Sequence, residues 1–504
     1  MAESFFNDEE LDWWGDTEPA AAVALPHVPR RRPPARTLAG DLRRLRAGFE
    51  RRSPIPAPVA GLLGLALLVA LAVAVRLSLG GEAAPEPVAA TPSPAVASAT
   101  TGESSPAAPA AGLLKEGKRG PQVHDLQVAL TALGLLSGAD GTYSGTTSTA
   151  VASFQGSSGL EADGVAGPVT AAALNEAFSQ RALEYAATAE AGIAAAVEAG
   201  RLDAATAEEA RGAVADTVQA VASQSPGSAA VLVLALRDVA ALADGYTTNR
   251  AALFEQLRVN VEALADGRPE MSLAGDVADG TGVLYRYFPE HGYQFHPLAS
   301  FIRLNNLARK GKGEEAGRLA DALVARGVRS GNALLWQYRF TFGGPDVWTS
   351  GFAQALGAQA LARTGELLGD RHLTEAAAAS FHAIPRDLTL PVAGGDWIQE
   401  YSFSDTAILN AQLESTVALR EYAELTGNEE AGAYVAGLSD TTKSVLDEFD
   451  TGCWSLYSLG GKAASSMYHT YHVHLLERLG RLTRDPVYRE TGQRWRGYLD
   501  AGGC

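Results

Sequence analysis

A repeat of about 57 residues in the C-terminal half constrains the fold of this 504-residue chain more than any other feature. Breaks at Gly311, Gly369-Asp370, Gly427-Asn428 and Arg484-Asp485-Pro486 each end one amphipathic run and begin another. That length suits one helical hairpin plus a long loop per repeat. Stacked hairpins that close on themselves form an (α/α) toroid, and an open superhelix is the competing outcome. We therefore expect a mainly α chain that ends in an (α/α) toroid or barrel.

Aromatic and polar residues gather in the long loops that precede the first helix of each hairpin. If every repeat runs the same way, these loops meet at one mouth of the toroid. Aromatic and polar groups on loops over a rigid scaffold suit sugar stacking and chemistry. The alternative is that the tryptophans and tyrosines only plug the toroid. The loops span Tyr285–Pro297, Trp336–Trp348, Gly394–Tyr401 and Trp454–His469.

The N-terminal part of the chain predicts a membrane anchor. Nine arginines between Arg30 and Arg52 precede the apolar run Val59–Val75, which with the residues up to Leu79 approaches the ~20 residues that cross a bilayer. The arginines lie on one side only, so the positive-inside rule places the N-terminus in the cytoplasm and the C-terminal domains outside. A cleaved signal peptide is disfavoured, because the head is long and no convincing small-x-small site follows. We expect a cytoplasmic head over 1–58, a single-pass anchor over 59–79 and a Pro/Ala/Ser/Thr linker over 80–112.

Net charge and cysteine content exclude several classes of protein. With 41 basic and 58 acidic residues the formal charge is −17, so the chain as a whole is no nucleic-acid coat. Two cysteines exclude a disulfide-stapled scaffold and a Cys-rich metal centre. Cys453 and Cys504 either pair in an oxidising compartment or remain free thiols. No nucleotide loop, Ser-His-Asp order or redox motif stands out, and we predict no cofactor and no metal.

A compact helical pattern with turns at two Asp-Gly pairs lies between Leu114 and Phe178. Its ordered signature is Gly120, Val123, Leu126-Gln127, Leu130, Asp140-Gly141, Thr147, Ala150-Val151, Phe154-Gln155, Gly159-Leu160, Asp163-Gly164-Val165, Gly167 and Thr170. With this signature the segment resembles the peptidoglycan-binding domain type 1 family. The resemblance implies a three-helix bundle over 113–178 that holds cell-wall glycan or stem peptide and has no chemistry of its own. Most of these residues are core and turn positions, which define the fold rather than a ligand site.

An Ala-rich helical region over 179–280 leads into a second recognisable segment over 281–504. The motifs in support are Gly292-Tyr293 with Pro297, Trp348–Gln354, Gln399–Tyr401, Leu409-Asn410, Phe449–Gly452, Ser455–Tyr457, Tyr468–His472 and Arg494–Leu499. In this order and spacing they resemble the catalytic domain of the D-glucuronyl C5-epimerases. The resemblance implies an (α/α) barrel and an isomerase that inverts C5 of glucuronate to iduronate within a polysaccharide.

Inversion at C5 sets the chemical requirements of the site. The C5 proton lies α to a carboxylate, so its removal generates an enediolate whose charge has to be neutralised. The reaction also needs a base on one face of the sugar and an acid on the other. By motif match we predict Glu400 as the base and Tyr468 as the acid or base of the opposite face. Tyr401 and Tyr457 would assist through hydrogen bonds or a proton relay. The alternatives are that Glu400 caps a helix or forms a salt bridge, and that Tyr457 only packs.

Further residues of the same loops are predicted to bind the sugar chain. They are Tyr293, Gln294, Arg339, Trp348, Gln354, Trp397, His469 and His472. A metal at the histidines is disfavoured, because HExxH spacing is missing. Family members that act on heparosan-type chains carry arginines where this chain has Gly460 and Ser465, so the charge would come from Arg286, Arg339 or Lys462. The uronate and its polymer stay open.

Together these features predict a membrane-anchored, wall-associated enzyme that epimerises uronic acid residues at C5 in an envelope or extracellular polysaccharide. Its partners would be that polysaccharide, peptidoglycan and the membrane. A lyase is an alternative, because the same carbanion can expel the C4 substituent by β-elimination. A non-catalytic glycan-binding scaffold is an alternative from a different class: the missing arginines favour it, whereas Glu400, Tyr401, Tyr457 and Tyr468 oppose it.

Overall fold

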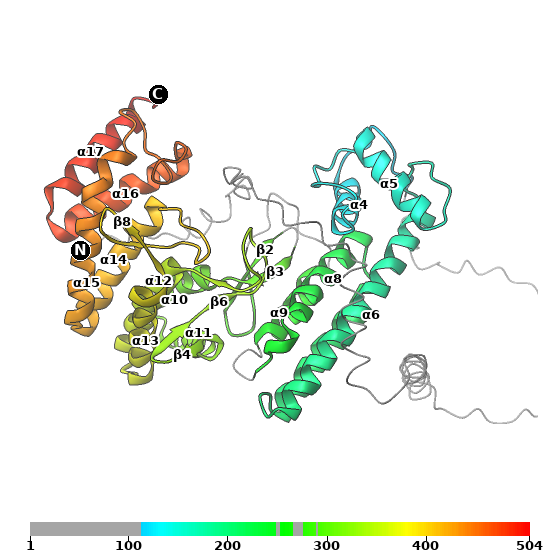
Figure 1. Cartoon of the computed structure of the whole chain (residues 1–504), viewed down its shortest axis with the longest axis horizontal. Coiled ribbons are helices and arrows are strands. Elements are labelled where there is room, and N and C mark those ends of the chain that lie inside the picture. The colour runs from blue at the N-terminus through cyan, green and yellow to red at the C-terminus, as the bar shows by residue number, and fades with distance from the viewer. Residues whose placement is uncertain (1–111, 248–251, 266–275, 289–290, 504) are drawn as a thin grey trace, which may run out of the picture. The chain divides into compact units, whose positions relative to one another are not determined.

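The computed structural model describes residues 112–247, 252–265, 276–288 and 291–503, which belong to one compact unit (Figure 1). The predicted head, anchor and linker lie outside the described residues, and so does Cys504. Within the described ranges, no helix is both long and apolar enough to cross a membrane. Cys453 is disulfide-bonded. The mainly α architecture that the sequence predicts is confirmed, since helices account for most of these residues.

Three helices begin the described chain: α4 (Pro121–Ala132), α5 (Gly145–Ser157) and α6 (Pro168–Glu198). Helix α6 runs through residue 178 without a break, so no loop marks the boundary predicted there. It continues into a helical layer with α7 (Ala204–Val221), α8 (Pro226–Ala241), η1 (Ala243–Gly245) and α9 (Ala252–Leu264). One apolar core joins these helices, and α4 packs against α8.

Two buried glutamines hold the turns of the first three helices in the same way. The Gln127 amide donates to the Asp140 carboxylate at 2.9 Å and to a threonine hydroxyl at 3.1 Å. The Gln155 amide repeats both bonds, at the same two distances, with Asp163 and a second threonine. Each aspartate also accepts a backbone N–H two residues on, which fixes the turn. The Gln and Asp-Gly positions of the signature are therefore structural.

Four helical hairpins form the rest of the helical structure, as the repeat predicts. Each hairpin turn places one residue in the left-handed region, with φ of 68° at Gly311, 66° at Gly369, 65° at Gly427 and 58° at Arg484. Such a residue ends a helix and redirects the chain. The pairs are α10 (Pro297–Arg309) with α11 (Gly313–Arg326), α12 (Gly351–Leu368) with α13 (Arg371–Asp387), α14 (Leu409–Thr426) with α15 (Glu429–Val445), and α16 (Ser466–Thr483) with α17 (Pro486–Asp500).

Short antiparallel strands, which the sequence analysis did not predict, stiffen the loops before α10, α12 and α14. The first sheet consists of β1 (Val277–Ala278), β2 (Leu284–Phe288) and β3 (Gly292–Phe295). The pairs β4 (Val328–Ser330) with β5 (Ala333–Leu335), and β6 (Gln337–Tyr338) with β7 (Trp348–Thr349), precede α12. The pair β8 (Thr389–Val392) with β9 (Gly395–Ile398) precedes α14, and η4 (Leu446–Phe449) follows α15. Backbone pairing between strands therefore orders part of each of these loops.

A polar network fills the space between the C-terminal halves of the inner helices α10, α12, α14 and α16. Glu421 accepts hydrogen bonds from Arg363, Arg478 and Gln359, and Asn305 donates to Gln359. All four inner helices line one cavity here, with a volume of about 30 Å³. A site of this volume has room for one or two water molecules. We call this group of residues the axial plug.

Candidate active site

One carboxyl and three phenol groups come together where the inner helices begin. Glu400 and Tyr401 follow β9, Tyr457 lies in the loop after η4, and Tyr468 lies in the first turn of α16. The rings of Tyr457 and Tyr468 lie 4.7 Å apart, and the Tyr457 hydroxyl is hydrogen-bonded to that of Tyr468. The Tyr401 hydroxyl donates to the Glu400 carboxyl. The structure thus brings together the four residues that the sequence analysis assigns to proton transfer.

The backbone around Glu400 is held by the neighbouring hairpin. The N–H of Gln399 donates to Leu388 O at 3.0 Å, and its carbonyl accepts from Gly351 N–H at 2.8 Å. A side chain at Gly351 would meet the carbonyls of both Leu388 and Gln399 at 2.8 Å, so glycine is needed for this close approach. These bonds hold the backbone next to Glu400 against the first residue of α12.

The environment of Glu400 favours the protonated form. Glu400 is only partly exposed, and its Oε2 is buried without a hydrogen-bond partner among the described residues. Burial raises the pKa of the carboxyl to about 7, although the hydrogen bond from Tyr401 works in the opposite direction. A carboxyl with this pKa can both take and return a proton near neutral pH.

Tyr468 is the most acidic of the three phenols. Burial raises the pKa of all three, and the charge of Glu400 raises them further. The pKa of Tyr468 rises only to about 12, because the hydrogen bond with Tyr457 and the positive charge of Arg286 lower it. Within the cluster, Tyr468 therefore gives up a proton more easily than Tyr401 or Tyr457.

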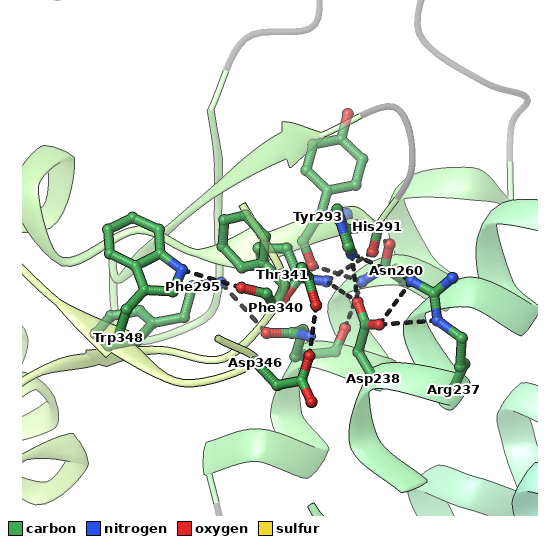
Figure 2. Close-up of polar contacts among 12 residues, drawn as sticks. Arg237, Asp238, Asn260, His291, Tyr293, Phe295, Phe340, Thr341, Asp346 and Trp348 are labelled. Carbon is green, nitrogen blue, oxygen red and sulfur yellow. Dashed lines mark hydrogen bonds and ion pairs between the residues drawn. The ribbon is translucent and has the colours of Figure 1, made fainter. Parts of the chain in front are cut away.

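Aromatic rings form one wall of the site. Tyr338 and Trp348 stack with centroids 3.9 Å apart and planes at 2°, because they face each other across β6 and β7. The Trp348 indole donates to Phe340 O at 3.0 Å, as Figure 2 shows, and its ring lies 5.6 Å from Tyr401. Phe342 lies 5.8 Å from Tyr401 and is 39% exposed. An exposed ring beside the carboxyl and phenols offers a flat apolar face to a sugar.

Arg286 is a cation whose charge acts on this cluster. On β2 its guanidinium binds Asp276 through Nε and Nη2, at 2.7 and 2.8 Å, and the side chain is 19% exposed. Its positive charge lowers the pKa of Tyr338, Tyr468 and the buried His296. Arg339, which the sequence analysis predicts as a binding residue, follows Tyr338 in the same wall and is partly buried.

The β2–β3 hairpin is anchored on the helical layer. His291 Nδ1 lies 2.8 Å from Asp238 Oδ2 of α8, and Arg237 binds the other carboxylate oxygen at 2.8 Å (Figure 2). Gln294 is fully buried and donates to His291 O at 2.6 Å. The backbone N–H of Tyr293 donates to a buried asparagine of α9 at 2.8 Å. The two predicted binding residues Tyr293 and Gln294 thus lie in the anchor of the hairpin.

Two further predicted binding residues serve the scaffold. Gln354 is fully buried; its amide donates to Leu334 O at 2.8 Å and its carbonyl accepts from Trp336 N–H at 3.0 Å. Trp397 is buried in the core of the last two hairpins, and its indole donates to Ile408 O at 3.2 Å. The structure does not bring either side chain into the cluster of Glu400 and the tyrosines.

His469 and His472 contact a residue of the Tyr457 loop from α16. Both imidazoles are fully buried and contact Ser455, which is two residues from Tyr457. The ring of His469 also stacks on Trp454 at 3.8 Å.

Tyr338, Phe342 and Asp276 were not among the predicted site residues, although the first two lie in one of the predicted aromatic loops. The alternation of aromatic residues on either side of β6 and β7 is a signal that could have paired Tyr338 with Trp348. Asp276 leaves no such signal, because its partner Arg286 is in another strand.

Two families match the chain, in the predicted order. Residues 119–174 match the peptidoglycan binding domain family, and residues 330–497 match the D-glucuronyl C5-epimerase C-terminus. A D-glucuronyl C5-epimerase of Caenorhabditis elegans is 26% identical over 180 residues, which cover 31% of this chain and 29% of the relative. An uncharacterised protein of Methanocaldococcus jannaschii is 26% identical over 183 residues, 32% of this chain and 57% of the relative. The chain thus spans less than two thirds of the length of either relative.

Solved structures resemble the chain more remotely. A cellobiose 2-epimerase from Bacillus thermoamylovorans is 11% identical with a TM-score of 0.36, covering 49% of this chain and 70% of that structure. A GH8 endo-β-1,4-glucanase from an Achatina fulica gut metagenomic library is 15% identical with a TM-score of 0.31, covering 40% and 68%. Scores this low carry no functional information. The chain is thus similar to the D-glucuronyl C5-epimerase C-terminus over residues 330–497 and, earlier in the chain, to the peptidoglycan binding domain family over residues 119–174.

Proposed function

We propose that the chain is a carbohydrate epimerase that inverts C5 of a uronic acid within an envelope or extracellular polysaccharide. The observation that carries the proposal is the arrangement of Glu400 and Tyr468 in one partly exposed cluster. The carboxyl has a pKa of about 7, and the phenol is the most acidic of the three in the cluster. These two groups can act as a base and an acid on opposite faces of one sugar carbon.

In the proposed reaction, ionised Glu400 takes the C5 proton and becomes a neutral carboxylic acid. The electron pair that is left behind spreads into the sugar carboxylate and forms an enediolate. Tyr468 then donates its proton to C5 from the other face, which inverts the centre and leaves a phenolate. The hydrogen bond from Tyr457 stabilises this phenolate. Proton exchange with solvent returns both groups to their starting state.

Arg286 is the residue that we propose to neutralise the enediolate. Asp276 engages Nε and Nη2 of its guanidinium, and Nη1 takes no part in these two bonds. A guanidinium that is already oriented loses little conformational freedom when it pairs with a carboxylate. The bond to Asp276 thus serves to hold the cation at the edge of the site. Phe342 and Trp348 would stack on the neighbouring sugar ring.

The remaining parts of the proposal concern where the enzyme works. The peptidoglycan binding domain would hold the wall, and the predicted anchor over 59–79 would tether the chain to the membrane with its C-terminal domains outside. Asp125 of α4 binds Ser225 Oγ at 2.8 Å and the N–H of Gly227 at 3.0 Å, at the first turn of α8. Wall binding and catalysis would therefore take place on parts of the chain that are in direct contact, rather than on two separate domains.

Deuterium incorporation tests the proposal. The full chain is incubated in heavy water with a panel of uronate polysaccharides, beside Glu400→Gln, Tyr468→Phe and the exposed control Glu314→Gln. We expect label at C5 in the wild type and the control, no label in the other two, and no chain cleavage. Formation of an unsaturated sugar would replace this proposal by a lyase. Polysaccharide binding that survives Glu400→Gln, without label in any protein, would replace it by a glycan-binding scaffold.

A further inference from the structure

Ser455 joins the loop of Tyr457 to the helix of Tyr468. Its hydroxyl lies 2.8 Å from His469 Nδ1 and 2.9 Å from His472 Nδ1, both on α16. Its backbone N–H also donates to His469 Nδ1, at 3.1 Å. All three side chains are fully buried. We call Ser455, His469 and His472 the Ser-His clamp.

The bonds of the clamp determine which nitrogen of His469 carries the proton. Since Nδ1 accepts the N–H of Ser455, the proton is on Nε2, which donates to Trp495 O at 3.1 Å. His469 is thus a neutral ring with both nitrogens used. His472 is neutral as well, because its Nε2 is buried without a partner among the described residues and burial lowers its pKa to about 3. The Ser-His clamp therefore keeps its charge state across the physiological pH range.

The position of the clamp relates it to the proposed proton transfer. Tyr457 is two residues beyond Ser455, and Tyr468 immediately precedes His469, so the clamp joins the same two segments that carry the tyrosine pair. The clamp is a direct side-chain link between the loop and α16, close to the two phenols.

We propose that the Ser-His clamp positions Tyr457 and Tyr468, so that the Tyr457 hydroxyl stays hydrogen-bonded to the acid of the epimerase site. The three residues touch neither phenol oxygen nor substrate in this role; they are positioning residues. The effect of the clamp on catalysis rests on the proposed function. Its effect on the position of the tyrosines rests on the contacts alone. A misplacement of about 1 Å at a reacting group can cost about 100-fold in rate.

Two substitutions separate positioning from stability. Ser455→Ala removes the hydroxyl that bridges the imidazoles. Ser380→Ala is the matched control, because Ser380 is equally buried and binds Gln354 O at 2.9 Å between α12 and α13, away from the tyrosines. At the second histidine, His472→Asn keeps a polar atom near the place of Nδ1, whereas His472→Leu does not.

Each full-length variant is measured in three ways. Thermal unfolding reports stability, C5 exchange gives kcat and KM, and fluorine NMR of fluorotyrosine in place of Tyr468 reports the packing of the pair without any substrate. We expect Ser455→Ala to shift the fluorine resonance and to lower kcat about 10- to 100-fold with KM changed less than about threefold. His472→Asn should retain most of kcat and His472→Leu should not. Ser380→Ala should lower only the unfolding temperature.

The fluorine resonance decides the inference even if no substrate is found. If the resonance stays in place in Ser455→Ala, or if kcat falls no further than in Ser380→Ala, the clamp is only structural and the inference is overturned. If the resonance shifts while the wild type exchanges no label with any polymer, the proposed function fails and the clamp stands as a structural link of the pair. A shift together with the kcat loss supports both.

Discussion

Substitution of Glu400 by Gln should make the folded protein more stable in alkaline solution, although it removes the proposed base. Burial raises the pKa of this carboxyl from 4.5 to about 7. Between these values the folded protein holds a proton that the unfolded chain has lost, so the stability of the wild type falls as the pH rises through this window. Gln carries no charge and escapes this loss, while its carbonyl still accepts the hydrogen bond from Tyr401.

The size of the effect follows from the pKa change. At about 1.4 kcal/mol per pKa unit, the rise at Glu400 corresponds to about 3 kcal/mol. The carboxyl keeps some contact with solvent, and the new amide has no acceptor where Oε2 now lies, so we expect about 2 kcal/mol. The gain should be fully present above about pH 8 and absent below about pH 4, where the wild-type carboxyl is protonated in both states.

Urea unfolding at several pH values measures this difference between wild type and Glu400→Gln. Glu421→Gln serves as the control of opposite sign. Arg478 and Arg363 hold the pKa of Glu421 below its usual value, although burial alone would raise it. That variant should be destabilised at neutral pH, and its deficit should shrink as the acid range is entered. A stability difference for Glu400→Gln that does not change between pH 4 and pH 8 would refute the reasoning.

Three further outcomes can be checked. In wild type, kcat/KM for C5 exchange should rise with pH through a midpoint near 7, because Glu400 has to be ionised to act as the base. Tyr457→Phe should raise the pKa of Tyr468 and lower kcat about 10- to 100-fold, with little change in KM. Arg484→Gly should raise the free energy of unfolding by about 0.5–1 kcal/mol in urea, because φ is 58° at this position and glycine adopts such a backbone without strain. Asp125→Ala should speed hydrogen exchange in the first turn of α8, because it removes the acceptor of the Gly227 N–H.

The helical part of the fold could be predicted because its signals are local. A glycine that ends a helix in the left-handed region acts on its own turn, and Gly311, Gly369 and Gly427 recur at the predicted interval. At the fourth hairpin turn the left-handed residue is Arg484 instead of a glycine. This turn is therefore predicted from the interval of the repeat and not from the residue type. The short strands gave no comparable signal, since strands of two to five residues do not show a period of two.

The part of the site that could be predicted consists of residues within sequence motifs. Glu400, Tyr401, Tyr457 and Tyr468 were selected by motif and lie together. Gln354 was selected in the same way, but its amide forms hydrogen bonds with the backbone of Leu334 and Trp336. These bonds depend on how α12 packs, which the motif does not show. Whether these residues catalyse the reaction stays a prediction.

The contribution of Arg286 could not be predicted with the same precision. From the sequence alone, Arg286 is only one of three possible cations, beside Arg339 and Lys462. Asp276 lies only ten residues before Arg286, but the influence of Arg286 on Tyr468 arises from the meeting of segments that are distant in sequence. Such a meeting follows from the tertiary fold rather than from any local pattern.

The axial plug limits how the proposed polymer substrate could approach Glu400 and the tyrosines. Glu421 lies twelve residues beyond the start of α14, so the plug is about 18 Å along the helix from its first residue. A cavity of about 30 Å³ at that depth admits no sugar ring. If the proposed polysaccharide is the substrate, it would not pass between the C-terminal halves of these helices and would bind at the end that carries Glu400 and the tyrosines. An enzyme that binds its polymer in this way would need no free chain end, and it could act on polymers whose two ends are both fixed.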